Sequence, residues 1–219
     1  MQLLTQNSKM KKSSTKINAV YNWTIPAFKG LDGTITCPNA SKCVSGCYAQ
    51  MGAYIWSNVR QAHQTKLELT RTETFVPLMI EAISSKLKKS KTVYIRIHDA
   101  GDFYSLDYTY KWFNIMQYFQ GKQVVFYAYT KQVQMFKDLA QDIPDNFKLI
   151  FSYGGKQDKL INPDKDRHSW VFKSDNDLQS KGYIDASHDD MLALTDNKKV
   201  GLVYHGNKSY TNTTWDKVK

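Results

Sequence analysis

Two stretches, Thr92-Val-Tyr-Ile-Arg-Ile-His98 and Gln123-Val-Val-Phe-Tyr-Ala-Tyr129, decide the fold. Each is apolar at nearly every position, which is the pattern of a β-strand that is covered on both faces. Between them, residues 105–119 carry apolar side chains at helical spacing, and Gly121 ends that segment. A strand, a helix and a second strand joined by short loops predict a βαβ unit in a parallel sheet.

The same alternation continues in both directions along the chain. The further predicted strands are residues 17–25, 148–153, 170–173 and 200–204, and the further predicted helices are residues 54–70, 74–87 and 133–139. About six strands favour an α/β fold with a partial or irregular (β/α) TIM-like barrel, and a doubly wound open parallel sheet is the alternative. We expect one domain over residues 17–219, preceded by a flexible basic arm at residues 1–16.

All three cysteines of the chain lie in one loop, residues 36–49, where Cys37, Cys43 and Cys47 have the spacing C-x5-C-x3-C. Three thiols within eleven residues indicate a ligand set, and an odd number confined to one loop argues against a disulfide framework. Three thiolates can hold a [4Fe–4S] cluster and leave one iron open. Zinc is the second interpretation: a structural zinc ion takes four ligands, so it would need a histidine or carboxylate from elsewhere in the chain. The third interpretation is that the thiols bind no metal.

Polar residues stand at the carboxyl ends of the predicted strands, where parallel α/β proteins keep their working face. They are Arg96, His98, Asp99, Gly101 and Asp102 at the second strand, Tyr127, Tyr129 and Lys131 at the third, Ser152 at the fourth, and His205 at the last. We expect these residues to open into one cavity beside the cysteine loop, and to bind a small molecule there.

Within this set, His98 stands beside two carboxylates, so it is the candidate fourth metal ligand or proton carrier. Asp99 and Asp102 would orient His98 or bind a substrate amine, although Asp102 also suits a turn or helix cap. Gly101 is expected where the backbone needs a positive φ or approaches a ligand closely. The remaining polar residues are candidates for cofactor binding, and the tyrosines are equally explained as half-buried barrel residues.

Four motifs between about residues 20 and 131 carry a resemblance to a known family. They are Asn22-Trp23-Thr24-Ile25-Pro26, the loop from Thr36 to Ala49, His98-Asp99-Ala100-Gly101-Asp102-Phe103, and Phe126-Tyr127-Ala128-Tyr129-Thr130-Lys131. With them the chain resembles the phage "gene product 88" family, which implies an iron–sulfur protein encoded by a phage, prophage or plasmid. A more distant similarity to radical S-adenosylmethionine (SAM) enzymes implies SAM at the open iron, but their C-x3-C-x2-C spacing and Gly-Gly-Glu-like motif are absent.

The composition indicates which partners and which cellular compartment suit the protein. The net charge of +10 and pI of about 9.3 suit a polyanionic partner such as nucleic acid, and simple solubility is the alternative. No apolar run is long enough for a membrane span, and the basic start is not followed by the apolar segment of a signal peptide. We therefore expect a protein that lies in the cytoplasm of a bacterial host. One expectation is an iron–sulfur enzyme with radical SAM-like or redox activity. The alternative is a non-enzymatic protein that a metal centre stabilises and that binds nucleic acid or has a regulatory role.

Overall fold

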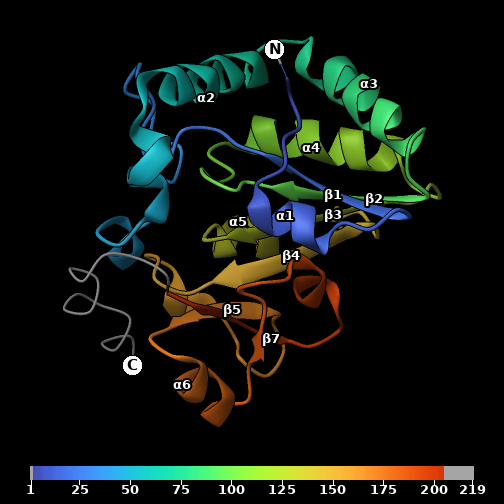
Figure 1. The fold of residues 1–219 in the computed structure, drawn as a ribbon. Helices are drawn as coiled ribbons and strands as arrows, with labels where there is room; N and C mark the ends of the chain where they lie inside the picture. Colours follow the sequence, from blue (N-terminus) through green and yellow to red (C-terminus); the bar gives the residue numbers. More distant parts are fainter. Residues whose placement is uncertain (1, 205–219) are drawn as a thin grey trace.

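A computed structural model of the chain describes residues 2–204, so Met1 and residues 205–219, with the candidate His205, lie outside the described part. The described residues form a curled sheet of seven parallel strands that makes a half-barrel (Figure 1). The strands are β1 (Asn18–Trp23), β2 (Thr92–Ile97), β3 (Val124–Thr130), β4 (Phe147–Ser152), β5 (His168–Phe172), β6 (Ile184–Asp185) and β7 (Lys199–Val203).

The strands stand in the sheet in the order β1-β2-β3-β4-β5-β7-β6. The alternative prediction of an open parallel sheet is therefore confirmed in its coarse form, and closure into a TIM-like barrel is not observed among the described residues. The order follows the chain except at one edge, so it lacks the reversal that marks a doubly wound sheet. Strand β6 was not predicted, because a two-residue strand has no periodicity to read.

The helices are α1 (Ser8–Ser13), α2 (Ser57–Thr70), α3 (Phe75–Leu87), α4 (Leu106–Tyr118), α5 (Val133–Asp138) and α6 (Asp175–Ser180). Helices α2, α3 and α4 lie together at the β1–β2 end of the sheet, and α6 lies at the other end beside β7 (Figure 1). Helix α4 begins as predicted, because the Ser105 side chain accepts a hydrogen bond of 3.2 Å from the Tyr108 backbone N–H. None of the helices between residues 2 and 204 has the length and apolar character that spanning a membrane requires.

A large aromatic core joins α2–α5 to one face of the sheet. Trp23 of β1 packs against Phe75 of α3 and Trp112 of α4, with ring centroids 5.3 and 6.2 Å apart. The strands contribute alternate residues to this face, as in Val93, Ile95 and Ile97 of β2. The side chains between them point to the opposite face, which therefore needs its own cover.

That cover comes from the N-terminal residues, which were expected to be a flexible arm. Instead, Leu4 and Met10 are buried, and Thr5 pairs with Asn22 on the outer edge of β1. Helix α1 packs against the sheet together with the 3₁₀ segment η5 (Asp190–Leu194). The arm prediction is wrong because two apolar side chains and one buried ion pair, between Lys9 and Asp190, hold this polar segment in place.

Candidate functional site at the cysteine loop

The cysteine loop lies across the carboxyl ends of β2, β3 and β4. The Thr36 carbonyl accepts a 3.0 Å hydrogen bond from the Asp102 backbone N–H, and the Cys43 N–H donates to the Gly154 carbonyl at 3.1 Å. The Asn39 side chain donates to the Gln132 side chain, just beyond β3. The strand ends and the loop therefore do converge at one edge of the sheet, as the order of strands and loops predicted.

The three thiols are free, partly buried and near one another. Burial, together with the charges of Asp102 and the other two thiols, raises the pKa of Cys37 to about 12, against an opposing hydrogen bond from the Phe28 backbone N–H. Burial also raises the pKa of Cys47, and Cys43 adds to that shift. The metal-free loop therefore keeps Cys37 and Cys47 protonated, so a metal must displace their protons to bind.

The donor groups of the described residues do not form a site for a single metal ion. Within residues 2–204, no group of three or more His, Cys, Asp or Glu side chains is gathered so that it could hold one metal ion. One ion needs every donor in a single coordination shell. In a [4Fe–4S] cluster each thiolate binds a different iron, so the thiols need only face one neighbourhood, as these three do.

Asp102 ties the loop to the sheet. The buried carboxylate accepts hydrogen bonds from the Thr130 hydroxyl at 2.6 Å, from the Phe103 N–H at 2.8 Å and from the Lys131 N–H at 2.9 Å. Burial raises its pKa, and these three hydrogen bonds oppose the shift. Both carboxylate oxygens accept hydrogen bonds from the protein, so Asp102 has a structural role at the base of the loop.

Lys131 and Ser152 stand at the same edge. The Lys131 ammonium donates to the Ser152 hydroxyl at 2.9 Å and to the carbonyls of Ser152 and Tyr153 at 3.2 and 3.0 Å. Its positive charge is one of the effects that lower the pKa of Cys47 against burial. Both residues therefore lie where the sequence placed them, within electrostatic reach of the thiols.

Arg96, Tyr127 and Tyr129 belong to a different cluster, on the sheet face that α1 covers. The Arg96 guanidinium lies 3.6 Å from Asp190 and 5.3 Å from the Tyr129 ring, and the Tyr127 hydroxyl donates to Asp190 at 2.9 Å. Lys9 completes the group with a 2.7 Å ion pair to Asp190. Arg96 and Tyr127 take part in a buried charge network, whereas Arg96 Nε and the Tyr129 hydroxyl have no hydrogen-bond partner among residues 2–204. Cofactor binding by these residues stays a prediction.

Asp99 connects the two clusters. Its carboxylate lies 3.8 Å from Arg96 and accepts a 2.5 Å hydrogen bond from the Tyr54 hydroxyl. The Tyr48 hydroxyl, directly after Cys47, donates to the Asp99 carbonyl. Burial raises the pKa of both tyrosines, and the Asp99 charge raises it further. Asp99 therefore anchors the end of the cysteine loop to the charge network.

His98 lies away from the thiols, in the aromatic core, with 3% of its surface exposed. Its φ of +68° turns the side chain from the Arg96 face to the helix face, where the ring stacks edge-on against Phe103 at 4.6 Å. Its Nε2 lies 2.9 Å from the Tyr108 hydroxyl, which also accepts from the Trp23 indole. Burial lowers the pKa of His98 to about 3, so a neutral core histidine replaces the expected ligand or proton carrier.

The low pKa of His98 predicts acid sensitivity. The unfolded chain binds a proton near pH 6.5 and the folded chain only near pH 3, so stability is lost as the pH falls through this interval. Between pH 6 and pH 4, His98→Gln should reduce the slope of unfolding free energy against pH by up to about 1.4 kcal/mol per unit in urea titrations. Equal slopes for wild type and His98→Gln would contradict the assignment.

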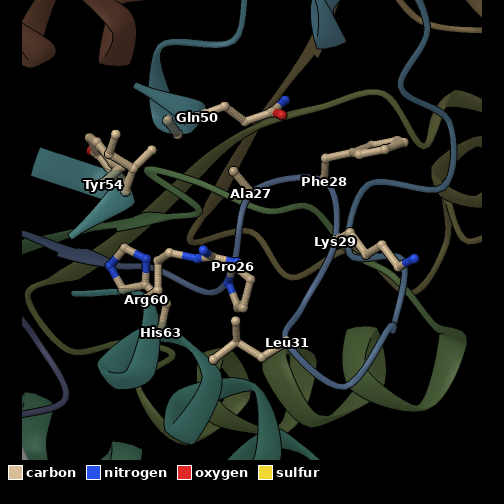
Figure 2. Close-up of a pocket in the computed structure, with 11 residues that line it drawn as sticks. Pro26, Ala27, Phe28, Lys29, Leu31, Gln50, Tyr54, Arg60 and His63 are labelled. Carbon is tan, nitrogen blue, oxygen red and sulfur yellow. The ribbon is translucent and has the colours of Figure 1, made fainter. Parts of the chain in front are cut away.

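A cavity of about 210 Å³ opens beside the cysteine loop (Figure 2). Its lining residues are Pro26, Ala27, Phe28, Lys29, Leu31, Ala49, Gln50, Tyr54, Ile55, Arg60 and His63. None of the residues expected to line a cavity at the strand ends is among them. The cavity is formed instead by the loop after β1 and by the segment that runs from Cys47 into α2. No sequence motif in these two segments indicates a cavity.

The comparisons with known proteins agree with the motifs. The family model described as Gene product 88 matches residues 1–216, which is nearly the whole chain. No curated protein matches the chain, and no solved structure does. The match extends well beyond the four motifs that first suggested the family. The chain belongs to the gene product 88 family.

Proposed function

We propose that the chain is an iron–sulfur protein in which Cys37, Cys43 and Cys47 bind a [4Fe–4S] cluster and leave one iron open. The observation that supports this most is the concentration of all three free thiols on one docked loop, close enough that neighbouring thiols raise the pKa of Cys37 and of Cys47. Three like-charged groups in a partly buried place repel one another unless a cation compensates them. A bound cluster supplies that compensation.

The protein would tune such a cluster through groups already directed at the sulfurs. The Phe28 backbone N–H hydrogen-bonds the Cys37 thiol, and the Gln50 side chain hydrogen-bonds the Cys47 thiol. Hydrogen bonds and a nearby cation such as Lys131 favour the thiolate form and raise the reduction potential of a cluster. When bound, the cluster would supply one-electron transfer and an open iron. Since His98 lies in the aromatic core, a small molecule is the expected fourth ligand, and SAM is the first to test.

The net charge of +10 supports a second candidate function, nucleic-acid binding by the basic surface. In that case the zinc ion or cluster in the loop would only stabilise the fold. Either function suits the cytoplasm of a bacterial host and a phage or plasmid origin, because free thiols persist in a reducing compartment. The metal content and the response to SAM separate the two.

The test is anaerobic purification of the full chain with iron, sulfide and zinc analysis. We expect about four irons and four sulfides per chain, with absorbance near 400 nm. Cys37→Ser, Cys43→Ser and Cys47→Ser should each lose most of the iron, whereas Ser41→Ala, at an exposed position of the same loop, should keep it. Zinc without sulfide, or iron that survives all three replacements, would refute the cluster.

Electron paramagnetic resonance of the reduced protein then distinguishes the roles of the cluster. A signal that SAM perturbs would indicate radical SAM-like chemistry. A cluster signal that SAM leaves unchanged would refute SAM as the ligand of the open iron while the cluster itself stands.

A further inference from the structure

The cavity beside the cysteine loop has walls from three parts of the chain. The loop after β1 contributes residues 26–31, the segment after Cys47 contributes residues 49–55, and α2 contributes Arg60 and His63. Figure 2 shows Tyr54, Arg60 and His63 gathered on one side of the cavity, with Phe28 and Lys29 on the other. Because three separate segments meet there, the cavity depends on the folded chain and not on one flexible loop.

The charged residues of the wall are all cationic. Lys29 and Arg60 line the cavity, and no Asp or Glu does. Among residues 2–204, neither side chain forms an ion pair or a side-chain hydrogen bond. Arg60 extends across the cavity toward Pro26 (Figure 2). Two cations without an internal partner in one concave site favour an anionic ligand, and an Arg fork suits a carboxylate or phosphate.

His63 adds a neutral polar group. Burial lowers its pKa to about 4, and the charge of Lys66 lowers it further. Near neutral pH its imidazole therefore offers one donor and one acceptor without positive charge. The anion-binding charge of the cavity comes from Lys29 and Arg60 alone.

Apart from Gln50 and the hydroxyl of Tyr54, the rest of the wall is apolar, so we expect the ligand to carry an apolar part as well. Leu31 and Ile55 line the cavity and are 48% and 57% exposed, and Pro26, Ala27 and Phe28 complete this surface. The cavity of about 210 Å³ is smaller than the ~300–1,000 Å³ of sites for drug-sized ligands, so the apolar part is about one ring or a short chain.

The backbone of Phe28 connects the cavity to the thiols. Its φ of +60° is uncommon for a residue with a side chain and costs about 1–3 kcal/mol, and such strain concentrates at ligand sites. The same residue lines the cavity and hydrogen-bonds Cys37, and Gln50 likewise lines the cavity and hydrogen-bonds Cys47. A ligand in the cavity would therefore lie one residue away from two of the three cysteines.

We propose that this cavity binds a small organic anion, a carboxylate or phosphate ester on a body of about one ring, with Arg60 and Lys29 holding the anionic group. SAM is a poor match for the cavity, since its sulfonium and ammonium groups would meet two cations and no carboxylate. The inference does not depend on the cluster, because no cysteine lines the cavity.

The experiment measures affinity by fluorine NMR for four ligands of nearly one shape: 4-fluorobenzoate, 4-fluorophenyl phosphate, 4-fluorobenzyl alcohol and 4-fluorobenzylamine. The full chain is used both iron-loaded and metal-free. At least one anion should bind ten times or more as tightly as the alcohol and the amine, and which anion binds identifies the group recognised. Equal affinity for anion and alcohol, or binding of neither anion, would overturn the proposal, whatever the iron content.

Matched charge changes locate the site. Arg60→Gln should weaken anion binding tenfold or more, and Lys29→Gln should weaken it severalfold. Lys89→Gln removes the same charge at an exposed position just after α3 and should leave the affinity unchanged. Since neither the Arg60 nor the Lys29 side chain has an ion-pair or hydrogen-bond partner among residues 2–204, circular dichroism should show folded variants. Equal losses in Arg60→Gln and Lys89→Gln would mean that the net charge and not this cavity attracts the anion.

Discussion

Replacement of Asp190 by alanine is expected to lower the free energy of unfolding by about 3–5 kcal/mol. The Asp190 carboxylate is fully buried and meets Lys9 at 2.7 Å, Arg96 at 3.6 Å and the Tyr127 hydroxyl at 2.9 Å. Burial raises its pKa, but the two cations more than offset this and leave the pKa below its usual range. Alanine at this position would remove the one fully buried carboxylate that Lys9 and Arg96 share, and would leave these two cations close together without it.

Urea unfolding at pH 7 measures this loss, and Asp196→Ala is the matched control. Asp196 forms a 3.2 Å ion pair with Lys148 at full exposure, so its removal should have little effect on the free energy of unfolding. Because the folded pKa of Asp190 is lowered, its contribution is complete above about pH 4 and is lost as the pH falls below that value. Trypsin should also cut faster after Lys11 or Lys12 in Asp190→Ala. Equal costs for the two replacements would refute the charge network.

Replacement of Gly101 by alanine is expected to cost about 4 kcal/mol, from two sources that add. The φ of Gly101 is +88°, where a side chain is strained. A Cβ there would also lie 2.2 Å from Cγ1 of Ile25, which is buried in the aromatic core. Relief of that clash must move either the segment after β1 or the turn that carries Asp102, so the iron content of the proposed cluster should fall together with stability.

Two further variants separate strain from clash. Gly121 has a φ of +74° and open space around its Cβ position, so Gly121→Ala reports the strain alone, about 1 kcal/mol. Ile25→Ala removes the clashing atom at the cost of a cavity. In a double-mutant cycle, Gly101→Ala with Ile25→Ala should cost at least about 1 kcal/mol less than the sum of the single changes. If Gly101→Ala costs no more than Gly121→Ala, the close contact with Ile25 has no effect.

The parts of the fold that the sequence predicted are those with local signals. Strands β2 and β3 are apolar at almost every position, and both faces of the sheet are covered where they lie. Gly101 was expected at a positive φ and has one, although its close neighbour is the Ile25 side chain and not a ligand. Ser105, the first residue of the predicted helical segment, caps α4. In each case the residue type itself limits the backbone.

The elements that escaped prediction are short and depend on distant contacts. Helices α1 and α6 have six residues each, below the length at which helical periodicity can be read. Helix α1 is polar apart from Met10, and the ion pair that holds it joins Lys9 to a residue near the other end of the chain. No local pattern marks such a pair.

The candidate site divides in the same way. The convergence of the cysteine loop with Asp102, Lys131 and Ser152 follows from parallel strand order, which the sequence supplied. The direction of each side chain does not follow. Simple alternation would put His98 on the Arg96 face, but a single positive φ sends it into the aromatic core. The cavity lined by Arg60 went unpredicted, because no spacing rule links a loop after β1 to the surface of α2.

Docking of α1 onto η5 also sets an order of assembly during synthesis. The Asp190 backbone N–H donates to the Ser13 hydroxyl, 177 positions away along the chain. A ribosome that adds about 5–20 residues per second needs roughly 10–40 s to cover that distance. Throughout that time helix α1 lacks the η5 surface that later holds it. Helix α1 is therefore made long before it can reach its final position.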